Sequence, residues 1–323
     1  MQTAATEFAE VLKFRFDTDI EAADGEAGRL AAVIADPATR AATHAVVKTR
    51  PLFGVTCFVP LHLVTAATAA TVSISIPLAE IEKMRARPDG VILNASTGVT
   101  TGRKPLGHLR QITVNRETRA PRHLVIERGG REVLVPAAMI ASIAPKQITV
   151  ELGELNPAQL VRYRPDDVIH QEVYDAIYDY PRLRVDLPGI VIHAIDGVVW
   201  LRGYVASDLN RRLVSDQLGS IVGLAELHNE LIADNQLAAA VSMALGRDPR
   251  TAGELIGVYP RLGTVHLRGN ARSAAARQAA GEIARTVPGV QAVVNELHLD
   301  PRAEVVPVLA SVTNEEDRVP GGT

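Results

Sequence analysis

A chain of 323 residues is longer than one ordinary hydrophobic core requires, so the sequence predicts roughly two to four domains. Its 47% hydrophobic content is that of a globular protein, and no stretch reaches the roughly 18 uninterrupted apolar residues of a membrane span, so no transmembrane segment is expected. The single cysteine excludes an internal disulfide, and the net charge of −3 excludes a general attraction to nucleic acid. The first residues lack a basic stretch followed by an apolar one, which favours residence in the cytoplasm.

Two related β-rich segments come first in the chain. Residues 28–48 match residues 107–127 at an offset of 79, with seven identities in 21 positions. Each segment has a glycine-bearing turn, a strand, a polar turn and a second strand, and each closes on an alternating strand, at 72–76 and 148–152. Short β-rich runs separated by Asp, Asn, Pro and Gly are typical of hairpins. We therefore expect one small all-β barrel or sandwich per segment.

The order of these signals resembles the PRC-barrel domain, which is known from the photosynthetic reaction-centre H subunit and from a ribosome-maturation factor. The first segment carries the Asp36-Pro37 turn and the Val59-Pro60 pair, whereas the second has Asn115 at the turn and Val135-Pro136 later. The resemblance covers about residues 12–78 and 91–152. It implies interaction modules and names no catalytic residue.

The second β-rich segment lies in a locally basic stretch. Residues 81–131 contain eleven Lys or Arg against four Asp or Glu, an excess of +7. The charges are spread through expected strands and turns without interleaved aromatic residues, which favours a solvated surface over a nucleic-acid site. Nucleic acid is therefore disfavoured as a partner, and an RNA- or ribosome-associated role through this basic half is kept as the alternative function.

A second repeat with a different pattern follows. Residues 190–232 match residues 256–298 at an offset of 66 without a gap, with twelve identities in 43 positions. A helical pattern precedes each copy, at 167–180 and 235–246, and each copy then has two strands, a helix and a last strand. The order αββαβ predicts a three-stranded sheet with two helices on one face.

This half resembles two BON domains in tandem, the module named for bacterial osmotic-stress and nodulation proteins. The resemblance is carried by the hairpins 197–203 and 263–269 and by the serines that follow them, Ser207 and Ser273. It implies binding of phospholipid or other hydrophobic surfaces and a role as an adaptor. From the residues themselves, Asp196-Gly197 predicts a tight hairpin turn, because both residue types tolerate positive φ.

Alternation along the middle strand gives the candidate interaction surface. In the second copy Val265 and Leu267 should face the helices, so His266, Arg268 and Asn270 face away. The same face of the first copy then holds the candidate residues Trp200, Arg202, Tyr204, Val191, His193 and Ile195. An aromatic and apolar patch with arginines at its rim suits a partner protein or a lipid interface. The alternative is that this face packs against the other copy or the β-rich half.

Two cross-strand ion pairs are expected on the same faces, Arg202 with Glu230 and Arg268 with Glu296. We interpret them as structural. The nine histidines show no metal-ligand spacing, and no nucleophile or nucleotide-binding motif is present. The sequence therefore predicts no enzyme, no cofactor and no bound metal.

The predicted architecture is multidomain, with two small all-β PRC-barrel-like units followed by two α+β (αββαβ) BON-like units. We expect a non-catalytic adaptor or scaffold that binds a partner protein or a peripheral phospholipid surface, in a stress or envelope response. It would be cytoplasmic or peripheral to the inner membrane face, and a homo-oligomer is compatible. The expected boundaries are 1–78 and 91–152 for the β units, 79–90 for a linker with a short helix, 153–165 for a second linker, 166–233 and 234–300 for the α+β units, and 301–323 for a disordered tail.

Overall fold

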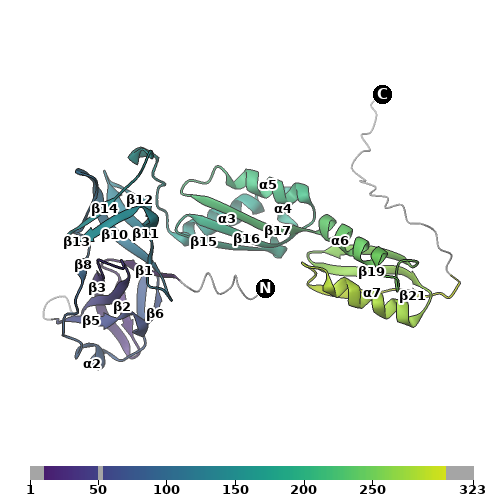
Figure 1. Ribbon diagram of the computed structural model, residues 1–323, viewed down its shortest axis with the longest axis horizontal. Helices are drawn as coiled ribbons and strands as arrows, with labels where there is room; N and C mark the ends of the chain where they lie inside the picture. Colours follow the sequence, from purple (N-terminus) through teal and green to yellow (C-terminus); the bar gives the residue numbers. More distant parts are fainter. Residues whose placement is uncertain (1–10, 50–53, 303–323) are drawn as a thin grey trace. The chain divides into compact units, whose positions relative to one another are not determined.

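The computed structural model describes residues 11–49 and 54–302, so most of the expected tail lies outside the described residues (Figure 1). The chain divides into two compact units, and the division runs through the first α+β repeat. The first unit contains the β-rich half through Tyr174 together with 192–200 and 219–228. The second unit contains 175–191, 201–218 and the chain from Asn229 onward.

The β-rich half forms two seven-stranded sheets of the same topology. The first has the order β5-β4-β3-β2-β7-β6, with β8 paired to β3. Its strands are β2 (Asp19–Ala22), β3 (Gly25–Ala35), β4 (Ala42–Lys48), β5 (Thr56–Pro60), β6 (Val64–Ala67), β7 (Thr71–Ile74) and β8 (Val91–Leu93). The second has the order β12-β11-β10-β9-β14-β13, with β1 paired to β10. Its strands are β9 (Gly98–Thr101), β10 (Lys104–Asn115), β11 (Pro121–Arg128), β12 (Arg131–Pro136), β13 (Ile140–Ala144), β14 (Gln147–Val150) and β1 (Val11–Arg15). We call β2–β7 the first β repeat and β9–β14 the second β repeat.

The two β repeats exchange their first strands. Strand β1 precedes the first β repeat but pairs with β10, where Phe14 lies opposite Ile112. Strand β8 precedes the second β repeat but pairs with β3, where Leu93 lies opposite Val33. Both pairs are related by the sequence offset of 79, so the exchange is symmetric. One apolar core joins residues of both repeats. The expectation of one self-contained unit per segment therefore differs from the structure, because alternation shows which residues are apolar but not which sheet they join.

A glycine shared by the two copies explains one of the sequence identities. A Cβ added at Gly28 would lie 2.2 Å from the Lys48 carbonyl oxygen, and one at Gly107 would lie 2.3 Å from the Glu127 carbonyl oxygen. On the other side of each glycine, the register between β2 and β3 and between β9 and β10 also shifts. Only a residue without a side chain allows two strands to approach this closely.

The chain that follows each β repeat covers the edge strand of its sheet. The Phe58 N–H on β5 donates to the Met84 carbonyl at 2.8 Å, and the Leu134 N–H on β12 donates to the Val161 carbonyl at 2.9 Å. A short helix, α2 (Leu78–Ile81), lies before the first of these segments. Covered edges cannot recruit further strands, and the second segment places residues 161–163 beside β12.

The C-terminal half contains the two expected αββαβ repeats. The first has α3 (Asp166–Tyr178), the short α4 (Pro181–Arg184), β15 (Ile190–Ile195), β16 (Val198–Val205), α5 (Asp208–Leu218) and β17 (Glu226–Ala233). The second has α6 (Asp234–Arg247), β18 (Leu255–Arg261), β19 (Thr264–Ala271), α7 (Ala274–Thr286), β20 (Ala292–Asn295) and β21 (His298–Leu299). The sheets have the orders β15-β16-β17 and β18-β19-β20, and β21 also pairs with β19. The last strand, continuous in the first repeat, is therefore interrupted in the second.

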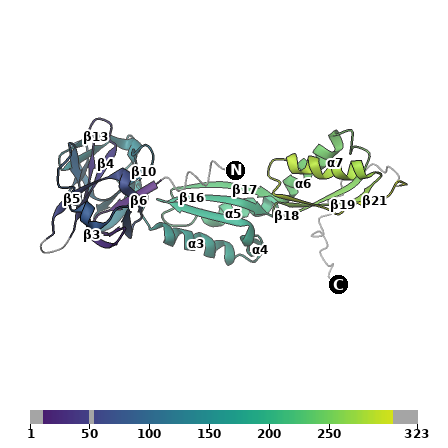
Figure 2. The same cartoon turned by 90° about the horizontal axis from the view of Figure 1, so that it is seen from below.

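The core of the second repeat lies between one face of its sheet and helices α6 and α7 (Figure 2). Val265 and Leu267 are fully buried beneath the helices, as the alternation predicts. Helix α7 contributes mainly alanines, among them Ala280 and Ala284, and such small side chains let a helix lie close to a sheet. Among the described residues, no helix lies on the opposite face of this sheet (Figure 2). None of the described helices is long and apolar enough to cross a membrane.

Candidate functional site

The uncovered sheet face of the second α+β repeat carries a row of three side chains. Tyr259 on β18 lies opposite His266 on β19, and Val294 on β20 lies opposite the same histidine. Tyr259 is 55% exposed and Val294 is 38% exposed, which is unusual for side chains of this size. The row therefore presents aromatic and apolar surface to solvent.

A second row of charged residues lies beside the first. Arg268 Nε donates to Glu296 Oε2 at 2.6 Å, and its guanidinium carbon lies 5.8 Å from the centroid of the Tyr259 ring. The hydrogen bond to Glu296 raises the pKa of Arg268, and the reciprocal bond lowers the pKa of Glu296. Tyr259 leans over Gly257, where a Cβ would lie 2.7 Å from Tyr259 Cε2. The glycine thus leaves room for the ring on the sheet.

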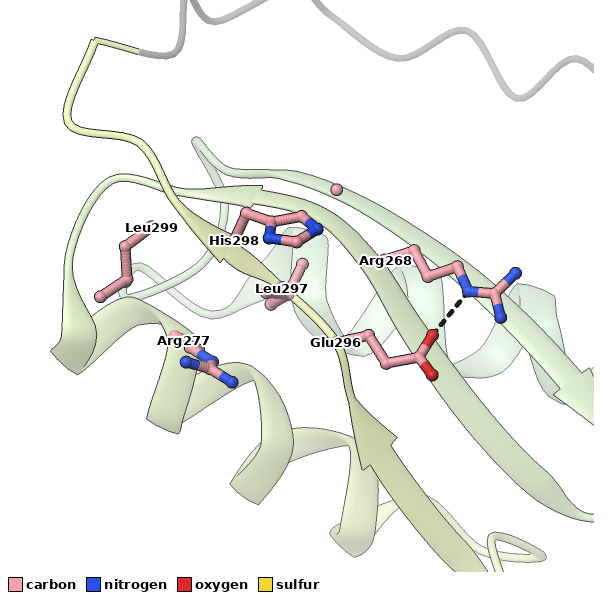
Figure 3. Close-up of a pocket in the computed structure, with 7 residues that line it drawn as sticks. Arg268, Arg277, Glu296, Leu297, His298 and Leu299 are labelled. Atoms are coloured by element: carbon pink, nitrogen blue, oxygen red, sulfur yellow. Dashed lines mark hydrogen bonds and ion pairs between the residues drawn. The ribbon is translucent and has the colours of Figure 1, made fainter.

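An open pocket of about 620 Å³ lies at one end of this face (Figure 3). Arg277 reaches it from α7, whereas its other lining residues come from the strand segments at Arg268–Gly269 and Glu296–Leu299. Its charged groups are two arginines and one glutamate, and the Arg268–Glu296 pair uses two of these three. Among the described residues no group of three or more His, Cys, Asp or Glu could hold a metal ion.

The first α+β repeat carries an aromatic stack at the matching position. The Trp200 and His228 rings lie 5.2 Å apart with an angle of 11° between their planes. His228 Nε2 lies 3.1 Å from Glu226 Oε1. Trp200 corresponds to His266 and His228 to Val294 at the offset of 66, so both repeats place a ring system at the centre of the same face.

The other predicted surface residues of the first repeat have different environments. Arg202 Nε donates to Glu230 Oε2 at 2.7 Å, the same arrangement as in the second repeat. Val191 is 50% exposed, and His193 is half-buried. Ile195 lines a groove of the first unit together with Lys13 and Arg15 of β1.

Tyr204 lies in a contact between the two α+β repeats. Its hydroxyl donates to the Gly289 carbonyl at 2.8 Å, and burial raises its pKa. A Cβ at Gly263, in the hairpin turn of the second repeat, would lie only 2.4 Å from Tyr204 Cζ. The alternative kept open in the sequence, that part of this face packs against the other copy, applies at Tyr204. The side chain does point out of its own repeat, and the second repeat covers it there.

The hairpin turn of the first repeat packs against the second β repeat through a buried charge cluster. Asp196 is fully buried, and its Oδ1 lies 2.8 Å from Lys13 Nζ on β1. His123 Nδ1 on β11 lies 3.5 Å from Asp196 Oδ2. Lys13 also pairs with Asp166 at the start of α3. A Cβ at Gly197, the other turn residue, would lie 3.1 Å from Leu134 Cδ1 on β12.

Burial and pairing act against each other in this cluster. Burial alone would raise the pKa of Asp196, but His123 and Lys13 outweigh it and hold that pKa at about 2. Burial likewise lowers the pKa of Lys13, and the two aspartates outweigh it, so the net shift is upward. For Asp166 burial wins, and its pKa is raised. Asp196 and Lys13 are therefore both charged at neutral pH inside the protein.

Sequence reasoning did not identify this cluster. The sequence predicts only a hairpin turn for Asp196, and the spacing of its histidines does not single out His123. One signal was present: a lysine at position 13 interrupts an otherwise apolar run between Leu12 and Phe14. Its partners lie far along the chain, so the sequence alone could not pair them.

The fold and the open sheet faces define a modular protein with two kinds of duplicated domain. The family model described as BON domain matches residues 165–233 and again 233–301, so the chain carries two BON domains in tandem. No curated protein shows a significant match to the chain. The resemblance of the β-rich half to PRC-barrel domains stays a prediction.

Two solved structures show a weaker likeness. One is a structure of CdsD, a structural protein of the type III secretion system of Chlamydia trachomatis, with 20% identity, a TM-score of 0.35 and coverage of 49% of this chain and 71% of that chain. The other is the C-terminal domain of CdsD, with 21% identity, a TM-score of 0.36 and coverage of 43% and 68%. At such scores the likeness carries no argument for this chain.

Proposed function

We propose that the protein is a non-catalytic adaptor or scaffold whose BON tandem binds a partner protein or a phospholipid surface through its open sheet faces. BON domains are known for binding phospholipids and proteins. A role in a stress or envelope response, peripheral to the inner membrane face, is part of the proposal. Residence in the cytoplasm and self-association stay predictions.

The observation that carries the proposal is the repetition of one surface pattern on both domains. Each sheet face combines a ring system with an arginine–glutamate pair of 2.6–2.7 Å. Aromatic side chains with a polar rim suit interfaces that are apolar in the middle and wet at the edge. The basic stretch gives less support to the RNA alternative, because Arg110 within it pairs with Glu127.

The test compares the wild-type protein with a variant of each face. Tyr259→Ser and Trp200→Ser remove the central rings, and Met243→Ser removes an equally exposed apolar side chain from helix α6 as the control. Co-sedimentation with phosphatidylglycerol–phosphatidylethanolamine vesicles measures lipid binding. Pull-down followed by reconstitution with the purified candidate measures protein binding.

We expect the two ring variants to lose binding in one of the two assays and the Met243 variant to keep it. Equal binding by all four proteins in both assays would contradict the proposed docking face. Turnover of a substrate that either ring variant abolishes would contradict the non-catalytic role.

A further inference from the structure

Strand β1 contacts three other parts of the molecule, namely β10, β12 and the first BON domain. Five of its residues pair with β10, and Leu12 and Phe14 are buried in the shared core. Arg15 makes two hydrogen bonds to Glu132 on β12, at 2.7 and 3.1 Å. Lys13 lies on the same side of the strand as Arg15, is only 7% exposed and reaches the first BON domain at Asp196. One strand therefore joins the exchanged β repeats to the BON tandem.

The internal duplication supplies a control for the role of Lys13. The position equivalent to Lys13 on the other exchanged strand is Ile92, at the offset of 79. Ile92 packs in a small apolar cluster with Ala32, Ile34, Val46 and Phe58. An aliphatic side chain is therefore what this position holds where no BON domain packs against it.

Two residues near Lys13 differ between the two β repeats in the same way, because they are apolar in the first repeat and polar in the second. Ile34 corresponds to Thr113, and Ala32 corresponds to Gln111. Gln111 is fully buried and accepts a hydrogen bond from the Tyr163 hydroxyl at 3.3 Å, in the segment that leads into the first BON domain. Polar groups thus replace apolar ones only on the copy that receives the Asp196 turn. Buried polar groups cost stability unless they are paired. A set of buried polar groups that pair across two domains therefore indicates a specific contact between those domains.

We propose that strand β1 is a strap that locks the hairpin turn of the first BON domain onto the second β repeat, with Lys13 as the locking residue. While the strap is seated, the β repeats and this turn move as one body. Withdrawal of β1 removes the cation from a fully buried carboxylate, so the turn is released together with the strand. The release of this turn is in this way controlled by the N-terminal strand.

The test uses the full chain and limited proteolysis of the linker at residues 153–165. Lys13→Met leaves Asp196 buried with His123 as its remaining partner. Because breaking a buried pair is strongly unfavourable, the open state and the cleavage rate should increase by about 100-fold. Lys48→Met, at an exposed lysine of the first β repeat, is the control and should be cleaved at the wild-type rate.

The double variant separates a lock from a general loss of stability. Lys13→Met combined with Asp196→Asn removes both charges of the fully buried pair, and its cleavage should return most of the way to the wild-type rate. Trp200 is the only tryptophan of the chain and reports by fluorescence whether the domain itself stays folded. Wild-type cleavage of Lys13→Met, or a double variant that is cleaved as fast as the single one, would overturn the proposal.

A further variant covers the case in which Lys13→Met does not fold. Asp196→Asn alone leaves Lys13 paired with Asp166, so its cleavage should increase by a smaller factor. Unchanged cleavage of this variant, with Lys13→Met unfolded, would assign Lys13 to the core of the β repeats and would reject the strap.

Discussion

The two BON domains use the same hairpin turn to make two different contacts. Asp196 and Gly197 have φ values of 49° and 79°, and Leu262 and Gly263 have φ values of 46° and 81°. An aspartate at the start of the preceding helix supports each turn. Asp166 accepts the Asp196 N–H at 2.8 Å, and Asp234 accepts the N–H groups of both turn residues of the second domain.

The partners of the two turns differ in chemistry. The first turn presents a carboxylate to Lys13 and His123, whereas the second presents Leu262 and Gly263 to Tyr204 and Gly189. An aspartate at position 262 would place a half-buried carboxylate against Gly189, and a leucine at position 196 would deprive Lys13 of a carboxylate. The shared backbone thus gives each domain a turn that packs against the preceding module, and the side chain selects which module it fits.

The largest effect is expected from removing the glycine that the second contact requires. A Cβ at Gly263 would be strained at positive φ and would collide with the Tyr204 ring. Gly263→Ala should therefore lower the free energy of unfolding by about 2–4 kcal/mol. Gly246→Ala in helix α6 is the control, since no atom lies within 4 Å of its added Cβ. Urea unfolding followed by circular dichroism measures both, and equal midpoints would contradict the contact.

Lowering the pH should affect the contacts of the two hairpin turns differently. The pKa of Asp196 is about 2 in the folded protein and 3.8 ordinarily, so its stabilisation is present above pH 3.8 and is lost as the pH falls toward 2. The loss amounts to about 2 kcal/mol. Burial raises the pKa of Asp166 and of Asp234, so these two groups change stability in the opposite direction.

The measurement is therefore a difference between the wild type and Asp196→Asn, with Trp200 fluorescence as the readout. The wild type should lose stability between about pH 4 and pH 2 relative to the variant. Leu262→Asn, at the matching position of the second turn, should leave the pH dependence of the wild type unchanged. Parallel curves for the wild type and Asp196→Asn would show that the Asp196 charge does not support the first contact.

Local features of these repeats could be predicted from the sequence because a few neighbouring residues determine them. The positive φ values of Asp196 and Gly197 are confirmed, and Ser273 caps helix α7 by accepting the Ala276 N–H at 3.0 Å. A residue type and its place in the sequence pattern are enough to predict each of these local features.

The contacts that place the domains could not be predicted in the same way. The exchange of β1 and β8 depends on which of two nearly identical sheets each strand joins, and the two copies present the same alternation to both. The alternation predicts that Tyr204 points out of its own sheet, but it does not predict that Gly289 of the other repeat covers it there. Long-range pairing of this kind is a property of the whole fold.

A smaller effect is expected at the tyrosine of the second contact. Tyr204→Phe keeps the ring against Gly263 and removes only the hydroxyl that donates to Gly289. The free energy of unfolding should fall by about 0.5–1.5 kcal/mol, the usual value of one hydrogen bond. Tyr259→Phe, on the open face, should change nothing in the same urea titration. An equal loss in both variants would show that the Tyr204 hydroxyl has no special role.

The smallest effect on stability is expected where the two domains are alike. Arg202 and Arg268 make the same pair with Glu230 and Glu296 on sheet faces that water reaches. Exposed ion pairs contribute little, because water and salt already screen the charges. Arg202→Ala and Arg268→Ala should therefore leave the thermal midpoint unchanged within error, and each should weaken docking in the vesicle or pull-down assay. A marked fall of the midpoint in one variant alone would mean that its pair belongs to a contact between modules, as the two turns do, and not to a shared docking surface.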